Sequence, residues 1–93
     1  MAVKFLWDEA KRKSNLRKHG IDFLDVREVF EGRTLTYEDD RFPYRERRFI
    51  TIGLLRATVV QIAHTEQDEI IRIIHARKAN RQTTAAYFTS FRD

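Results

Sequence analysis

The sequence predicts an α+β domain made of a helix hairpin, a four-stranded antiparallel sheet and a C-terminal helix. Three observations support this. Apolar residues recur every three or four positions up to Gly32, whereas β-branched and aromatic residues dominate from Thr34 to Arg77. The connections between the later segments are short, which is typical of antiparallel neighbours. Helical spacing returns after Ala79. We expect residues 1–93 to form a single domain.

The first helix is predicted from Asp8 to His19. Asp8 follows an apolar stretch and is a favourable N-cap residue, because its carboxylate can accept from free backbone N–H groups. Gly20 can adopt the left-handed conformation that ends many helices, and Ile21 can then pack back on Leu16. The helix therefore has clear start and stop signals.

A second, short helix follows, with Asp22 as its cap and Gly32 beyond its end. Its apolar residues recur at three- and four-residue spacing, which gives one apolar side. They are Phe23, Val26, Val29 and Phe30.

The four predicted strands are Thr34 to Glu38, Arg47 to Gly53, Ala57 to His64 and Ile70 to Arg77. Strands two to four are expected to form a meander, and the first strand joins them through a polar loop around Asp39 to Pro43. Tyr87, Phe88 and Phe91 lie at helical spacing within a final helix from Ala79 to Arg92. We expect the helices to cover one sheet face and leave the other partly open.

Charge is distributed unevenly along the 93 residues, whose net charge is +4 and pI about 9.8. Lys and Arg outnumber Asp and Glu by six to two in residues 1–20 and by eight to four in residues 47–93, whereas residues 21–46 carry four against eight. Basic blocks of this kind favour a polyanionic partner. The alternative is a set of solvated charged faces.

The composition argues against several classes of protein. There is no cysteine, and the three histidines are too far apart for a local zinc motif, so we expect neither a metal nor another cofactor. No apolar run approaches the roughly 20 residues needed to cross a bilayer, and the N-terminus lacks a signal-peptide pattern. We therefore expect a cytoplasmic protein with no membrane partner.

Several strings, in this order, resemble the BrnT family of bacterial type II toxins from Phe5 to about Tyr87. Each string is weak, but their order and spacing are specific. The strings are Phe5-x-Trp7-Asp8-x-x-Lys11, Asn15-x-x-Lys18-His19-Gly20-Ile21-x-Phe23, Tyr44-x-Glu46-x-Arg48, Ile52-Gly53, Thr65-Glu66 and Arg72-Ile73-Ile74-x-Ala76-Arg77-Lys78-Ala79.

The resemblance implies a ribonuclease that arrests translation, with a fold similar to RelE-type toxins. It also implies a cognate BrnA-type antitoxin, with DNA contacted mainly through the antitoxin. This chain departs from the usual pattern at four places: Arg45 replaces a glycine, Gln67 an arginine, His75 a serine, and Thr83 or Thr84 a glutamate.

Metal-free RNA cleavage needs proton carriers and fixed cations, because a 2′-hydroxyl attacks the phosphate and negative charge accumulates. We predict that Arg48, Arg72 and Arg77 hold phosphate and that Glu46 and His64 carry protons. Lys11, Lys78 and Tyr44 are predicted to bind substrate.

Each candidate also has a structural interpretation. Glu46 and Arg48 would share a strand face as an exposed ion pair, Arg72 could be a paired structural arginine, and His64 a satisfied strand-end histidine. His64 is expected opposite Ile71, on the face of Ile73, His75 and Arg77, although a slip of one residue would pair it differently.

A non-catalytic function is the alternative. The chain could bind RNA or the ribosome, or act as the antitoxin-binding subunit of a DNA-binding autorepressor complex. Intact RNA retained in a salt-sensitive way would indicate a binder rather than an enzyme.

Overall fold

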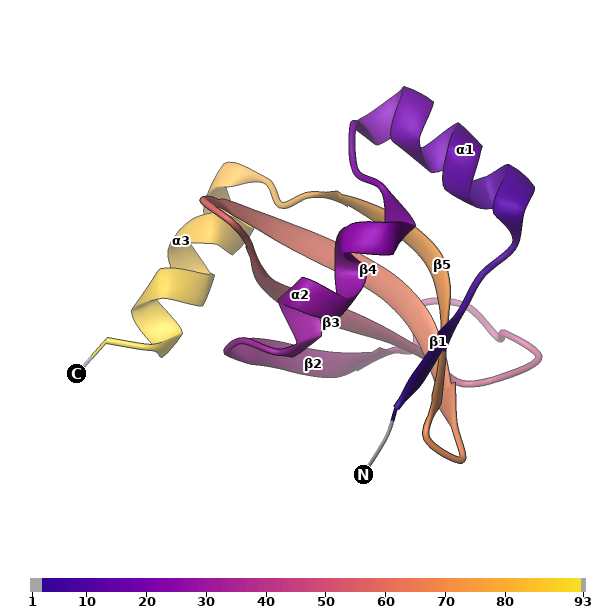
Figure 1. The fold of residues 1–93 in the computed structure, drawn as a ribbon. Helices are drawn as coiled ribbons and strands as arrows, with labels where there is room; N and C mark the ends of the chain where they lie inside the picture. The colour runs from indigo at the N-terminus through magenta and orange to yellow at the C-terminus, as the bar shows by residue number, and fades with distance from the viewer. Residues whose placement is uncertain (1–2, 93) are drawn as a thin grey trace.

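The computed structural model describes residues 3–92 and contains one five-stranded sheet with helices on both faces (Figure 1). The strand order is β1-β5-β4-β3-β2. The elements are β1 (Lys4–Leu6), α1 (Glu9–His19), a 3₁₀ turn η1 (Phe23–Asp25), α2 (Val26–Phe30), β2 (Thr34–Asp39), β3 (Arg48–Leu55), β4 (Thr58–Gln67), β5 (Ile70–Lys78) and α3 (Arg81–Ser90).

The predicted α+β class is confirmed, but the four-stranded antiparallel sheet is not. The additional strand β1 runs parallel to β5, with Phe5 opposite Ile71, so the sheet is mixed. Three residues are too few for alternation to distinguish a strand from a helix lead-in, and the partner strand is distant in sequence. The four antiparallel strands themselves lie where the sequence predicts them, within a few residues.

The helices cover both sheet faces, not one as expected. On one face, η1 and α2 pack on β4 and β5 through a cluster that contains Phe23, Val26, Val29, Val60, Ile62 and Ile73. On the other face, α3 places Tyr87 in a second cluster with Ile50, Ile52, Val59 and Ala63. We refer to these as the hairpin face and the α3 face.

Gly53 permits the close approach of α2 to β3. A Cβ atom at this position would lie 2.8 Å from Cγ1 of Val29 and 3.1 Å from Cγ2 of Thr34. A larger residue would therefore push α2 away from the sheet.

Helix α1 begins and ends as predicted. The Asp8 carboxylate accepts from the backbone N–H groups of Ala10 and Lys11, and Gly20 has the left-handed φ of 72°. The buried Asn15 joins the helix to the exposed edge of β5: its amide donates to the Ala76 carbonyl at 2.8 Å and accepts from the Ala76 N–H at 3.0 Å. β1 pairs only with residues 70–72 of β5. Beyond that part, the Asn15 side chain satisfies both backbone groups of Ala76.

The β4–β5 hairpin has a different register from the predicted one. Asp68 and Glu69 form the turn with φ of 51° and 65°, so both strands are longer than expected, and His64 lies opposite Ile73. The pairing shifts between Ala63 and His64, which marks a β-bulge.

Within residues 3–92, no helix has the length and apolar character needed to span a membrane.

Candidate functional site

Arg48, Arg72 and Arg77 point to the α3 face, beyond the part that α3 covers. Arg48 lies two and four residues before Ile50 and Ile52, which pack under α3, so it shares their sheet face. Arg72 and Arg77 adjoin Ile73 and Ala76, which pack on the hairpin face, so their own side chains point the other way. The open part of the sheet is therefore rich in arginine.

The bulge in β5 is what brings Arg72 and Arg77 to one face. They are separated by an odd number of positions, so a regular strand would send them to opposite faces. The bulge adds one residue, Ile74, because His75 pairs with Ala63 whereas Ile73 pairs with His64. His75 consequently lies on the same face as Arg77, as predicted, but Ile73 does not.

A hollow at the edge of this open surface joins three segments of the chain. It is lined by Lys11 from α1, Arg48 from β3 and Arg72 from β5, together with Asp8, Ile73 and Ile74. We call it the Arg48–Arg72 hollow. Three cations from distant parts of the sequence thus surround one polar depression.

Glu46 forms an ion pair with Arg72, and not with Arg48 as in the structural alternative. Glu46 precedes β3, so strand alternation does not apply to it. The two side chains are 48% and 50% exposed, so solvent and ligands can reach both partners.

Arg48 is held by its neighbours in the loop before β3. Its guanidinium lies 4.2 Å from the centre of the Tyr44 ring, and the Tyr44 hydroxyl donates to the buried Asp39 at 3.1 Å. Hydrogen bonds from the Arg41 guanidinium hold the pKa of the Asp39 carboxyl well below its usual range. Tyr44 therefore orients Arg48, and its role in binding substrate stays a prediction.

His64 lies on the hairpin face, away from these arginines. Its ring is fully buried between Phe30 and Phe49, and Nε2 lies 2.7 Å from the Thr51 hydroxyl. Burial lowers its pKa to about 4, so the ring is neutral at physiological pH. This position does not support the predicted role as a proton carrier, because the buried ring is closed to any ligand at the surface.

Lys78 also points away from the open surface. It follows Arg77 on β5 and lies opposite Val60, a hairpin-face residue. Strand alternation therefore separates it from the arginines.

His75 is half-buried beside a second hollow between α1 and β5, which we call the α1–β5 hollow. Lys11, Ser14, Lys18, His19 and His75 contribute to its lining. Burial lowers the pKa of His75, and the charges of Arg77, His19, Arg41 and Arg48 lower it further. Because Lys11 and Ile74 line both hollows, the two are neighbours.

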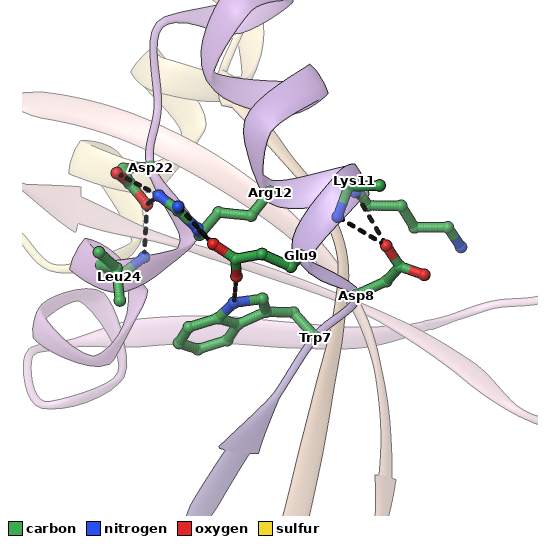
Figure 2. Close-up of polar contacts among 8 residues, drawn as sticks. Trp7, Asp8, Glu9, Lys11, Arg12, Asp22 and Leu24 are labelled. Carbon is green, nitrogen blue, oxygen red and sulfur yellow. Dashed lines mark hydrogen bonds and ion pairs between the residues drawn. The ribbon is translucent and has the colours of Figure 1, made fainter.

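The contacts around the start of α1 explain how Lys11 reaches the site (Figure 2). Trp7 Nε1 donates to Glu9 at 3.1 Å, Arg12 forms ion pairs with both Glu9 and Asp22, and the Asp22 carboxylate accepts from the backbone of Leu24. These contacts tie the helix to η1, and Lys11 extends to the opposite side from Arg12.

Metal ligands do not gather within residues 3–92: no three His, Asp or Glu side chains are placed to hold one ion. Three of the four charged side chains that line the Arg48–Arg72 hollow are cations, which do not bind metal ions.

A family model described as "Ribonuclease toxin, BrnT, of type II toxin-antitoxin system" matches residues 7–83, which is most of the chain. The protein belongs to the BrnT family. A solved structure, the Brucella abortus ribonuclease toxin BrnT, matches with a TM-score of 0.68 and 28% identity, over 86% of this chain and 100% of that one. A search of curated proteins found no match.

The family resemblance expected from the motifs is thus confirmed, and this BrnT-family chain is a ribonuclease toxin of a type II toxin–antitoxin system. The implied similarity to RelE toxins stays a prediction, as do the roles of the individual residues.

Proposed function

We propose that this toxin cleaves RNA without a metal ion, with the scissile phosphate bound between Arg48, Arg72 and Lys11. The observation that supports this most strongly is that these cations, from three separate elements, line one solvent-accessible hollow. Guanidinium groups suit phosphate because they can donate two parallel hydrogen bonds to it. Arg77, exposed on the same face, would bind the RNA backbone outside the hollow.

Glu46 supplies the base in this proposal. In the free protein its carboxylate forms an ion pair with the Arg72 guanidinium, in the position that we propose for the phosphate. When the phosphate takes its place, the released carboxylate lies beside the reaction centre and accepts the proton of the 2′-hydroxyl. The 2′-oxygen then attacks phosphorus and the P–O5′ bond breaks. The departing 5′-oxygen takes a proton from water, which leaves a 2′,3′-cyclic phosphate and a 5′-hydroxyl.

The arginines stabilise the charge that develops in this reaction. Negative charge increases on the non-bridging oxygens as the 2′-oxygen attacks, and cations already held in place respond without reorganisation. The Tyr44 ring under Arg48 and the Asp39 carboxylate behind Tyr44 fix one of these cations before substrate binds.

In the cell, the proposed consequence of this cleavage is arrest of translation in the cytoplasm. A BrnA-type antitoxin would neutralise the toxin, and DNA would be contacted only through the antitoxin complex. The family match supports an antitoxin partner and an RNA target in general terms.

The test is cleavage of RNA by the purified toxin in EDTA, with the product ends analysed. We expect 2′,3′-cyclic phosphate ends, and a rate that falls at least about 100-fold in Arg72→Ala. Arg47→Ala is the matched control, because Arg47 is also exposed and also paired with a glutamate, Glu38.

Three results would contradict the proposal. Intact RNA that is retained in a salt-sensitive way would identify a binding module. Cleavage that needs added Mg²⁺ would contradict the metal-free mechanism. Equal rates in Arg72→Ala and Arg47→Ala would place the site elsewhere.

A further inference from the structure

The α1–β5 hollow is cationic and lies outside the reaction centre proposed above. Lys11, Lys18, His19 and His75 all contribute to its lining, and Arg77 lies close enough to His75 to lower the pKa of that ring. The lining therefore carries the ammonium groups of Lys11 and Lys18 from α1, and His75 adds an imidazole from β5 whose lowered pKa favours its neutral form.

These charges have no carboxylate partner within residues 3–92. Elsewhere, Arg12, Arg41, Arg47, Arg56 and Arg72 each form an ion pair with Asp or Glu. No such pair involves Lys11, Lys18 or Arg77 in the described part of the chain. Cations left unneutralised at close range repel one another, so an anion bound among them would be stabilised.

One lining residue of the hollow, His75, also has a polar atom that lacks a partner. Nδ1 of His75 is buried and makes no hydrogen bond within residues 3–92. Because Nδ1 is the covered nitrogen, Nε2 is the one that the half-buried ring can offer to a ligand. Ser14 adds a hydroxyl from the first turns of α1.

We propose that the α1–β5 hollow binds the RNA phosphate next to the scissile one. This inference rests on the proposed function, since it places the neighbouring nucleotide of the same substrate. The two hollows share Lys11 and Ile74, so a strand whose scissile phosphate lies at Arg48 and Arg72 continues into the second hollow. There Lys18 and His75 hold the adjacent phosphate, with Lys11 between the two.

The substrate class that follows is an RNA segment with at least two consecutive phosphates. A substrate with only the scissile phosphate would lose the contacts of Lys18 and His75. Selectivity at this hollow would be for backbone charge, because ammonium and imidazole groups recognise a phosphate whatever base it carries.

The experiment uses a short RNA cleaved at one mapped bond, with a neutral methylphosphonate in place of the phosphate immediately 5′ or immediately 3′ of that bond. For the wild-type toxin we expect kcat/KM to fall about tenfold at one of these two positions, the loss of one charge-assisted contact. In Lys18→Ala, the same replacement should have almost no further effect.

Lys13→Ala is the matched control, because Lys13 is an exposed lysine of the same helix that does not line the hollow. It should keep the full tenfold response. Lys18 is exposed, so its replacement should not disturb folding. His75→Gln should also weaken the tenfold response, because the ring holds the same phosphate as Lys18.

The inference is overturned if neither methylphosphonate slows the wild type, or if Lys18→Ala keeps the tenfold response. Affinities for the 2′-deoxy forms of these oligonucleotides, which cannot be cleaved by the 2′-hydroxyl route, provide the same comparison without catalysis. If the toxin cleaves no RNA, but the methylphosphonate weakens binding to the wild type and not to Lys18→Ala, the proposed reaction is contradicted. The second phosphate site is then still supported.

Discussion

At the scale of residues, Glu46 and Arg72 are coupled before substrate arrives. Their ion pair is half-exposed, so water screens it and its net stabilisation is below about 1 kcal/mol. Such a pair opens easily, and a phosphate with two oxygens for the guanidinium competes well for Arg72. The Glu46 carboxylate therefore has two proposed roles: it competes with the substrate phosphate for Arg72, and it is the general base.

Glu46→Gln is predicted to separate these two roles. Removal of the competing charge frees Arg72, so affinity for a non-cleavable RNA should rise about two- to fivefold. The cleavage rate should nevertheless fall by about 100-fold or more, because the base is lost. Binding titrations and single-turnover cleavage measure the two effects.

Glu38→Gln is the control, because Glu38 pairs with Arg47 outside the site. It should change neither quantity. A Glu46→Gln toxin that cleaves at the wild-type rate would remove Glu46 from the mechanism.

His64 gives a prediction about stability. Its pKa in the folded protein, about 4, lies below the ordinary histidine value of 6.5, so the unfolded chain binds more protons between these values. Stability is therefore present above pH 6.5 and is lost as the pH falls from 6.5 towards 4. Between about pH 7.5 and about pH 5, His64 should account for a loss of about 2 kcal/mol in the free energy of unfolding.

Urea denaturation at the two pH values tests this effect. His64→Gln should be less stable than the wild type at neutral pH, and its stability should depend less on pH. His19→Gln, which changes an exposed histidine, should keep the wild-type dependence. If His64→Gln retained the full dependence, the ring would not be the group that titrates.

At the scale of elements, the attachment of α1 to β5 depends on Asn15. Its amide makes two hydrogen bonds with Ala76 and one with the Ile21 carbonyl, all in a buried position. This contact sets where Lys11, Ser14 and Lys18 stand relative to the sheet.

Asn15→Ala is predicted to destabilise the fold by about 2–4 kcal/mol, because the backbone groups of Ala76 lose their partners in a buried place. Hydrogen exchange at the Ala76 amide should become faster. Ser14→Ala, at the neighbouring half-buried position, should cost less than about 1 kcal/mol. Unchanged protection of Ala76 would show that the Asn15 contact is not needed there.

The sequence allowed most elements to be predicted, because their signals are local. Asp8 and Gly20 mark the ends of α1, and alternating apolar residues mark the long strands. The strand β1 was missed because it is three residues long and pairs with a distant partner. The bulge at Ile74 was also missed, since nothing in a run of isoleucines indicates which residue will be extra.

The placement of the candidate side chains could be predicted in part for the same reason, whereas their roles stay predictions. Arginine in an apolar strand indicated an exposed position for Arg72, and its side chain does reach the open surface. His64 gave an equally strong signal but lies in the core, because burial depends on which face Phe30 and Phe49 cover. The local sequence does not contain that information.

At the scale of the whole molecule, the two faces of the sheet differ in how they are covered and in their charge. The hairpin face is sealed by an apolar cluster, whereas the α3 face is covered over one part and cationic over the rest. Lys11, Lys18, Arg48 and Arg72 line the two hollows at the open part, so positive charge gathers where RNA is proposed to bind.

This arrangement predicts how RNA affinity depends on salt. About five phosphate contacts, from Lys11, Lys18, Arg48, Arg72 and Arg77, give a slope of roughly −3.5 for log affinity against log salt with single-stranded RNA. Arg77→Ala should make the slope shallower by about 0.7. Arg56→Ala should leave it unchanged, because Arg56 lies near Asp25 and Glu28. Equal slopes in all three proteins would contradict a backbone-binding surface here.

The most direct test of the central claim is an NMR titration of the toxin with a 2′-O-methyl RNA that binds but cannot react. We expect the largest chemical-shift changes at Lys11, at Glu46 and Arg48, and at residues 72–77, and we expect them to weaken in Arg72→Ala. Changes confined to α2, β1 and the surroundings of His64 would contradict the claim, because the RNA would then bind on the opposite face of the sheet.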